Sequence, residues 1–227
     1  MKAVTHMNEN AKVRLDPQES DTNHLLNWDV FVTPSIPTVW SDLPPGTKQL
    51  MWSPISSTLI FGKRDAVLVD AFITAEQAGA LVDWVEARGK NLTTIYATHG
   101  HGDHFFGIGA LLDRFPNARA VATPEVVKVM RQQASPQSLA SFWNPFFPGQ
   151  ISNHLVIAEG LTENVMDLEG RDLVVVPLGH TDTDCTTCLH VPSVGLVVGE
   201  RHAARVLRGK WLRLWRLSAN LRCRTPL

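Results

Sequence analysis

Residues 92–104 read LTTIYATHGHGDH, and the fold follows from this stretch. Its first seven residues are rich in β-branched side chains, which predicts a strand. Directly after it, four metal-ligand side chains lie within six residues: His99, His101, Asp103 and His104. Packing does not explain them, because such a cluster offers little apolar area and repels itself when protonated. The stretch therefore predicts a metal site at the end of a strand.

The spacing of these four side chains indicates which of them can bind the same metal ion. Side chains two residues apart on an extended backbone point to the same side, so His99 and His101 can bind one ion. Gly102 lets the backbone turn, and Asp103 and His104 can then face a second ion. We therefore expect one or two ions, with Zn²⁺ as the first candidate and Fe or Mn as alternatives.

Strands and helices alternate around this stretch. Residues 57–70 form two apolar runs joined by a turn, which predicts a hairpin. Residues 74–90 predict a helix that Thr74 caps and Gly89 ends. After the metal motif, the pattern predicts a helix at 105–115, a strand at 118–123 and a helix at 124–133. This alternation favours a layered α/β fold with a mixed sheet.

The flanking regions are less regular. Residues 28–54 are rich in Pro and Trp, which predicts loops with short edge strands. Residues 141–149, SFWNPFFPG, are interpreted as an aromatic loop whose rings line a substrate mouth or form a separate hydrophobic cluster. From residue 154 to 199, strands are expected in HLVIAEG, RDLVVVPLG, CTTCLHVPS and VGLVVGE.

Composition limits the classes of function. The chain has 227 residues, of which 44% are hydrophobic, so it can bury a core. Its net charge of −1 argues against a nucleic-acid-binding protein. The three cysteines do not form a disulfide scaffold and fit a cytoplasmic location, and no apolar run reaches the ~18 residues of a transmembrane helix. The pair Cys185 and Cys188 is interpreted as structural, since no second CxxC accompanies it.

Charge is distributed unevenly along the chain. Residues 201–227 carry eight Lys or Arg and no acid, whereas residues 1–200 carry 13 against 22 acids. This break predicts three parts: a flexible N-terminal segment at 1–27, a domain at 28–200 and an atypical basic tail at 201–227. Two explanations of the tail stay open. One is that a frameshift or aberrant gene end replaced the natural C-terminal half, and the other is a basic helix that touches a membrane or partner.

The pattern H-x-H-x-D-H after a strand resembles the signature of the metallo-β-lactamase superfamily. The resemblance extends over roughly residues 48–200 and includes the strand ending at Asp70 and a Gly-His-Thr at 179–181. It implies a four-layer αββα sandwich with the metal site along one edge of two sheets. It also implies that His99, His101 and His180 hold the first ion and that Asp103 and His104 hold the second. Asp70 matches an acid that supports the metal-ligand loop.

Two departures from this family concern the second ion. Where the family has a bridging Asp after a Gly, this chain has Glu200, which is one methylene longer; His202 is a neighbouring substitute. The family's last His should follow some 40 residues later, but no histidine follows His202. We therefore expect the second half of the fold to be incomplete.

The resemblance implies a metal-dependent hydrolase that acts on a small-molecule substrate. Hydroxide bound to zinc would attack an ester, thioester, lactone, amide or phosphoester, and Asp103 would orient it and help move its proton. Two alternatives stay open: an impaired metal-binding remnant, and a mononuclear iron enzyme that oxidises thiols or persulfides. Nucleic acid is excluded as a partner and membrane contact is disfavoured.

Overall fold

The structure, a computed structural model, describes residues 25–39, 43, 45–181, 183–199 and 202–206, of which the last range is described by its backbone alone. Its first sheet has six strands in the order β1-β4-β5-β6-β7-β8. These strands are β1 Asn27–Val32, β4 Ser56–Phe61, β5 Asp65–Val69, β6 Asn91–Tyr96, β7 Arg119–Ala122 and β8 Glu159–Gly160. β1, β4 and β5 run antiparallel, and β5 to β8 run parallel, so the sheet is mixed as predicted.

The second sheet has five antiparallel strands in the order β13-β12-β11-β10-β9. They are β9 Val165–Leu168, β10 Arg171–Gly179, β11 Thr186–Val191, β12 Leu196–Gly199 and β13 His202–Val206. A small two-stranded sheet pairs β2 Ile36–Pro37 with β3 Met51–Trp52. β13 lies in the basic tail and pairs with β12, so the change in composition at residue 200 falls between two paired strands. The remainder of the tail and residues 1–24 lie outside the described residues.

The helices of the described residues lie between Ala75 and Phe146. They are α1 Ala75–Glu86, α2 Ile108–Arg114, α3 Pro124–Gln133, α4 Pro136–Ser138 and α5 Asn144–Phe146, with a 3₁₀ turn, η1, at Gly102–His104 and a π-helical turn, η2, at Leu139–Trp143. The predicted cap of α1 is confirmed: Thr74 Oγ1 accepts from the Gln77 amide, and the Gln77 side chain accepts from the Thr74 amide. Such a cap stabilises a helix by about 1 kcal/mol.

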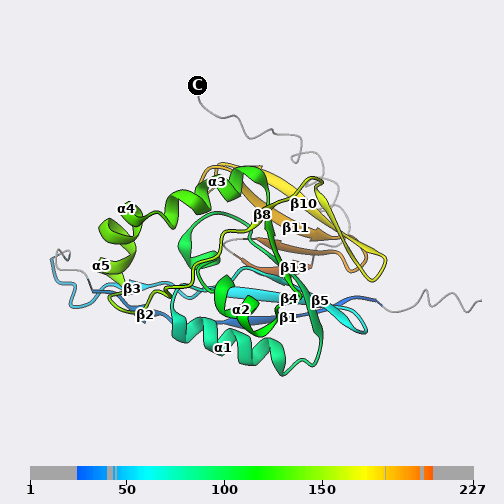
Figure 1. The fold of residues 1–227 in the computed structure, drawn as a ribbon, viewed down its shortest axis with the longest axis horizontal. Coiled ribbons are helices and arrows are strands. Elements are labelled where there is room, and N and C mark those ends of the chain that lie inside the picture. The colour runs from blue at the N-terminus through cyan, green and yellow to red at the C-terminus, as the bar shows by residue number, and fades with distance from the viewer. Residues whose placement is uncertain (1–24, 40–42, 44, 182, 200–201, 207–227) are drawn as a thin grey trace, which may run out of the picture.

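Two hydrophobic clusters hold the layers together. The first lies between the helices and the first sheet, where Leu81, Ile108 and Met130 pack on Leu68 and Ile95. The second lies between the two sheets and is made of alternate residues from both; it includes Ile60, Val67, Val69 and Tyr96 from the first sheet and Leu173, Val175, Leu189 and Val198 from the second. In Figure 1, α1 and α2 lie on one side of β1, β4 and β5, and β10 and β11 lie on the other.

These clusters define three of the four expected layers: helices, first sheet and second sheet. The long helices in the described part of the chain bury their apolar side chains in the first cluster, and none covers the outer face of the second sheet. Within the same residues, no helix combines the length and apolar character that crossing a bilayer requires.

Two local predictions were wrong. The aromatic segment 141–149 is largely helical, because residues 138–144 keep right-handed helical dihedrals and Pro145 lies in the first turn of α5, where a missing N–H costs little. The expected strand at 154–160 is reduced to β8, because its apolar residues Leu155, Val156 and Ile157 pack on the first cluster without a strand partner. β9, in turn, was not predicted.

Candidate metal centre

The metal motif lies at the carboxyl ends of two parallel strands. β5 and β6 run side by side with Val69 opposite Tyr96, so the residues that follow them meet at one edge of the sheet. The Asp70 amide donates to the Tyr96 carbonyl at 2.8 Å, and the Ala71 amide donates to the His104 carbonyl at 2.7 Å. The loop after β6 is therefore fixed to the end of β5 at both ends of the motif.

Asp70 makes several of the hydrogen bonds that hold this loop. Its Oδ1 accepts from the Thr98 amide at 2.8 Å, and its Oδ2 accepts from the Thr98 hydroxyl at 2.8 Å and lies 2.9 Å from His104 Nδ1. The residue is buried and has a positive φ of 64°, a region that costs most L-residues free energy and that Asp and Asn tolerate best. Asp70 therefore holds Thr98 and His104 in place, and its role as support for metal ligands stays a prediction.

The same hydrogen bonds determine which imidazole nitrogens carry protons. His104 Nδ1 must donate, because its partner is a carboxylate oxygen. The Thr98 hydroxyl gives its one proton to Asp70, so His99 Nδ1, 3.1 Å from that oxygen, donates to it. In its neutral form each ring therefore keeps its lone pair on Nε2, the nitrogen left to bind a metal ion.

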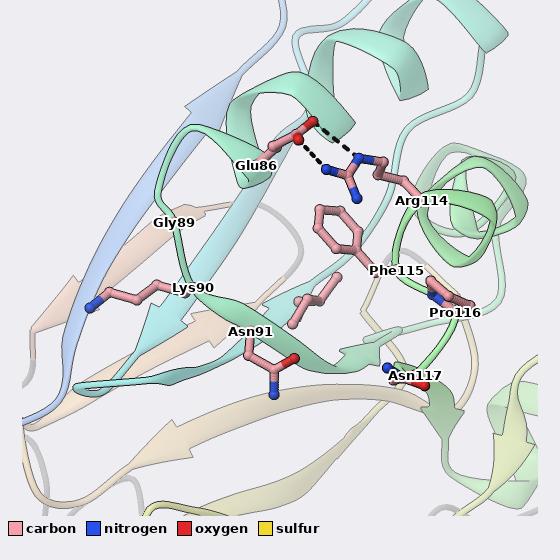
Figure 2. A pocket seen from close by; sticks show the side chains of 9 residues that line it. Glu86, Gly89, Lys90, Asn91, Arg114, Phe115, Pro116 and Asn117 are labelled. Carbon is pink, nitrogen blue, oxygen red and sulfur yellow. Dashed lines mark hydrogen bonds and ion pairs between the residues drawn. The ribbon is translucent and has the colours of Figure 1, made fainter.

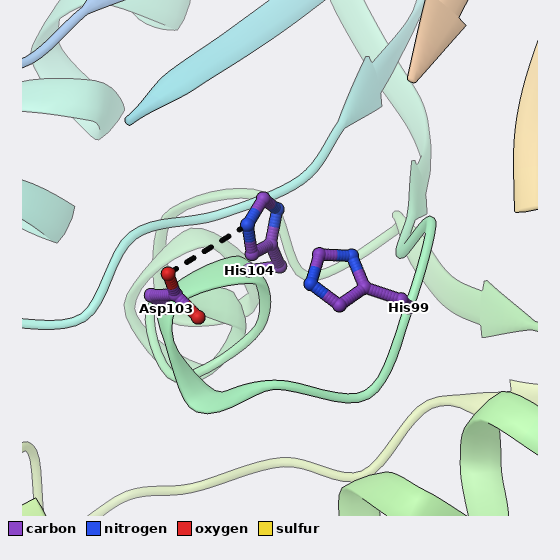
Figure 3. A group of neighbouring side chains, drawn as sticks. All are labelled: His99, Asp103 and His104. Atoms are coloured by element: carbon purple, nitrogen blue, oxygen red, sulfur yellow. Dashed lines mark ion pairs between the residues drawn. The ribbon is translucent and has the colours of Figure 1, made fainter. Parts of the chain in front are cut away.

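Three side chains come together as a possible ligand set. His99, Asp103 and His104 each offer one ligand atom, and these atoms lie within 4.8 Å of one another. Figure 3 shows the ring of His99 beside that of His104, with Asp103 on the other side of His104. The two rings have centroids 3.9 Å apart, and His104 Nε2 lies 3.7 Å from Asp103 Oδ2.

The chemistry of this set fits a divalent ion. His99 Nε2 and Asp103 Oδ1 are buried and have no hydrogen-bond partner within the described residues. Leaving a buried polar atom unpaired costs about 1–3 kcal/mol, and a bound cation would satisfy both atoms. Imidazole nitrogen and carboxylate oxygen are donors that zinc takes in proteins.

Electrostatics keeps His99 in the state that a metal ion needs. Burial, and then the neighbouring imidazoles of His104 and His101, hold the pKa of His99 far below its usual value. The ring is therefore neutral at physiological pH, with its Nε2 lone pair available.

The other predicted ligands are placed differently. The half-buried His101 has its ring centroid 5.2 Å from that of His99, but it does not join the group of three. His180 follows β10 as expected, yet its side chain is 75% exposed and its Nδ1 lies 2.7 Å from Asp184 Oδ1. Glu200 lies outside the described residues, and of His202 only the backbone, in β13, is described.

Both glycines of the motif are required by close packing. A Cβ on Gly100 would lie 2.5 Å from Val129 Cβ and 2.9 Å from the Met130 backbone nitrogen, both in α3. A Cβ on Gly102 would lie 2.5 Å from the ring of Phe106 and 2.8 Å from that of Trp143. Helix α3 and the aromatic segment therefore press directly on the backbone of the metal-ligand loop.

Two threonines that the sequence analysis did not single out connect the sheets beneath this loop. The Thr187 amide and hydroxyl, in β11, donate to the Thr98 carbonyl at 2.9 and 2.6 Å. Thr187 Oγ1 also lies 2.5 Å from the hydroxyl of the buried Tyr96. Because Thr187 donates its only proton to Thr98, Tyr96 donates to Thr187. Thr98 directly precedes His99, so its place beside the metal motif could have been noticed in the sequence. Thr187 is 89 residues from Thr98, and no local pattern connects the two.

Trp52 is the other functional candidate that sequence reasoning missed. Its indole Nε1–H donates to Asp103 Oδ2 at 3.3 Å. The two residues are 51 positions apart, and no pattern in the sequence connects them.

A groove of about 410 Å³ lies away from this centre, at the start of β6. Figure 2 shows it between the ends of α1 and α2, where Glu86 pairs with Arg114 beside Phe115. The hydrogen bond from Arg114 lowers the pKa of Glu86. Since β6 has six residues, the groove and the metal centre lie at opposite ends of a strand ~17 Å long. The groove is therefore not part of the metal centre.

The two described cysteines do not form a pair. Cys188 is buried in β11, where desolvation raises the pKa of its thiol to about 12. Cys185 precedes that strand with a positive φ of 62°, and no disulfide joins the two residues. The structural interpretation of this motif fits the different surroundings of the two side chains.

The structure is that of an α/β protein with a group of possible metal ligands, His99, Asp103 and His104, at the carboxyl edge of its first sheet. The profile of the metallo-beta-lactamase superfamily matches residues 50–198, about two thirds of the chain. The chain belongs to the metallo-beta-lactamase superfamily.

The chain is also similar to solved structures. The metallo-beta-lactamase from Pontibacter korlensis is similar with a TM-score of 0.51 and 16% identity, over 74% of this chain and 70% of that one. The BLEG-1 B3 metallo-beta-lactamase is similar with a TM-score of 0.46 and 16% identity, over 63% of this chain and 65% of that one.

One curated relative matches a shorter region. The hydroxyacylglutathione hydrolase of Parasynechococcus marenigrum (strain WH8102) is 36% identical over 58 residues, which is 26% of this chain. The match spans 22% of the relative's own length.

Proposed function

We propose that this chain is a metal-dependent hydrolase, with zinc as its ion. The observation that carries this proposal is the pair of buried atoms without partners, His99 Nε2 and Asp103 Oδ1, in a ligand set that Asp70 orders. Membership of a superfamily with a hydrolase-type fold supports it. The substrate class is an ester, thioester, lactone, amide or phosphoester of a small molecule.

When bound, zinc supplies Lewis acidity and lowers the pKa of a water from about 15.7 towards 7. The chain's own residues hold and orient the reactants. His99 and His104 present Nε2, because hydrogen bonds to Thr98 and Asp70 hold the proton of each ring on Nδ1. Besides binding the ion, Asp103 would orient the attacking water and help to move its proton.

The proposed ligand set extends beyond these three residues. His101 and His180 would complete the first ion's ligands with His99, and the His180 side chain, which lies outside the group of three, would have to move towards it to do so. Its side chain is 75% exposed, so this movement meets little resistance. Glu200 is the proposed bridging ligand.

The test is hydrolysis of ester, thioester, lactone and lactam probes by zinc-loaded protein. A hydroxyacylglutathione thioester is the first probe, because of the relative described above. We expect hydrolysis that His99→Ala abolishes and that His154→Ala leaves unchanged, since His154 is exposed and binds Asp113 at 3.2 Å instead. Equal rates for wild type and His99→Ala would refute the proposal.

A second candidate is a chain that binds one metal ion without turnover. The exposed position of His180 and the grouping of only three ligand atoms among the described residues favour it. Metal content by elemental analysis separates the two. About two ions per chain supports the hydrolase, and a single ion with no hydrolysis of any probe supports the second candidate.

A further inference from the structure

The two carboxylate oxygens of Asp103 have different surroundings. Oδ2 accepts the indole N–H of Trp52 at 3.3 Å and lies 3.7 Å from His104 Nε2. Oδ1 is buried and has no partner among the described residues. One oxygen is therefore held by the protein, and the other is left for a ligand.

Trp52 is itself held firmly. It lies in β3, where it is paired with Ile36 of β2. Its ring meets four others with centroids 5.4 to 6.4 Å away: Phe142, Trp143, Phe146 and Phe147. We call these five residues the aromatic cluster. Each such pair contributes ~0.5–1.5 kcal/mol, so the indole has little freedom to turn its N–H away from Asp103.

The arrangement in space explains why this contact forms. β2, β3, α4 and α5 lie together at one end of the molecule in Figure 1. The aromatic cluster thus joins two segments distant in sequence, around residues 52 and 142–147, and it reaches the loop because the Trp143 ring lies over Gly102. Trp52 is the member whose polar atom touches a candidate ligand.

We propose that Trp52 is a positioning residue for Asp103. By binding Oδ2, its N–H restricts rotation of the carboxylate and keeps Oδ1 directed at the metal ion. Without this bond the carboxylate can turn, because a terminal torsion of this kind is broad and low in energy. The inference rests on the proposed metal site and adds a residue that supports it.

Zinc affinity tests the proposal without any measurement of activity. Trp52→Phe removes the N–H and keeps an aromatic ring. Trp143→Phe is the matched control, because it removes an indole N–H from the same cluster that donates to Gln133 at 2.9 Å rather than to Asp103. Calorimetric titration with zinc should give a 10–100-fold weaker affinity for Trp52→Phe, as is typical for loss of a group that orients a ligand, and an affinity near wild type for Trp143→Phe.

A double-mutant cycle separates positioning from packing. In an Asp103→Asn background, Trp52→Phe should weaken zinc binding little further, since the oriented carboxylate is already gone. The same loss in both backgrounds, or equal losses for Trp52→Phe and Trp143→Phe, would show that the aromatic ring acts through packing and would overturn the proposal.

An isosteric replacement covers the case in which Trp52→Phe does not fold. Benzothienylalanine at position 52 exchanges the N–H for sulfur and keeps the size of the ring, so folding should survive and zinc affinity should still fall. Unchanged affinity in this variant overturns the positioning role alone. Absence of zinc binding by the wild type overturns the proposed function and this inference together.

Discussion

Asp70 and His104 are joined by a hydrogen bond of 2.9 Å between Oδ2 and Nδ1, although 34 residues separate them. The bond connects the end of one parallel strand to the loop after the next, and in the neutral ring it leaves the lone pair on Nε2. We predict that this carboxylate controls metal binding by orienting His104.

Asp70→Asn tests this control. Asn tolerates the positive φ of 64°, so the backbone should be kept. Its amide, with the oxygen facing the Thr98 N–H, presents NH₂ to His104 Nδ1, which moves the ring proton to Nε2 and blocks the ligand atom. We expect zinc affinity to fall about 10–100-fold in calorimetric titration. Asp113→Asn makes the same change in another Asp–His contact, with the exposed His154, and should leave zinc affinity unchanged.

Gly100→Ala should destabilise the fold. The new Cβ would meet Val129 and the backbone of Met130 in α3, and such overpacking costs about 1–3 kcal/mol. Gly79→Ala is the matched control, because no atom lies within 4 Å of a Cβ at that exposed position in α1. It should raise stability by about 1 kcal/mol. Urea unfolding measures both, and equal free energies for Gly100→Ala and wild type would contradict the packing argument.

The contribution of Glu169 to the stability of the fold depends on pH. Its carboxylate accepts the backbone N–H groups of Lys63, Arg64 and Asp65, in the turn between β4 and β5. The bonds from Asp65 and Arg64 are the main causes that lower its pKa from 4.5 to about 2. Because the folded pKa is depressed, the stabilisation is complete above about pH 4.5 and is lost as pH falls towards 2.

The corresponding measurement is unfolding of wild type and Glu169→Gln between pH 7 and pH 2. Wild type should be more stable at pH 7, and the difference should shrink below pH 4.5. Glu163→Gln, the same change at another exposed position, is the control variant. A constant difference at all pH values would rule out the carboxylate as the cause.

Thr187→Val should weaken the hydrogen bonding between β11 and the residues at the end of β6. Valine keeps the shape but removes the hydroxyl that donates to the Thr98 carbonyl and accepts from Tyr96. The buried Tyr96 hydroxyl would lose its partner, at a cost of about 1–3 kcal/mol. Thr187→Ser retains the hydroxyl and should recover most of this loss in thermal or urea unfolding. A similar loss in both variants would indicate that the methyl group matters instead.

Local signals predicted much of the fold. The hairpin of β4 and β5, the capped helix α1 and the strand before the metal motif were confirmed, because each depends on neighbours within a few residues. The aromatic segment was misread, since its Pro and bulky rings favour a loop locally whereas burial of Trp143 and Phe147 favours helical turns.

The candidate centre was predictable only where its residues are contiguous. His99, Asp103 and His104 come together as their order in the sequence suggests. The contacts that Trp52 and Thr187 make depend on how separate segments pack, and no periodicity encodes them. The ligand roles of His180 and Glu200 stay predictions.

Strand β13 lies beyond the change in composition at residue 200, yet it is part of the second sheet. Its backbone supplies hydrogen-bond partners to β12, with Leu196 opposite Val206 and Val197 opposite Arg205. A shortened protein ending at residue 200 would bare the N–H and C=O groups of β12 along an open border, a template on which other chains can add. β13 is the edge strand of the second sheet, so its loss would move that edge one strand inward, to β12.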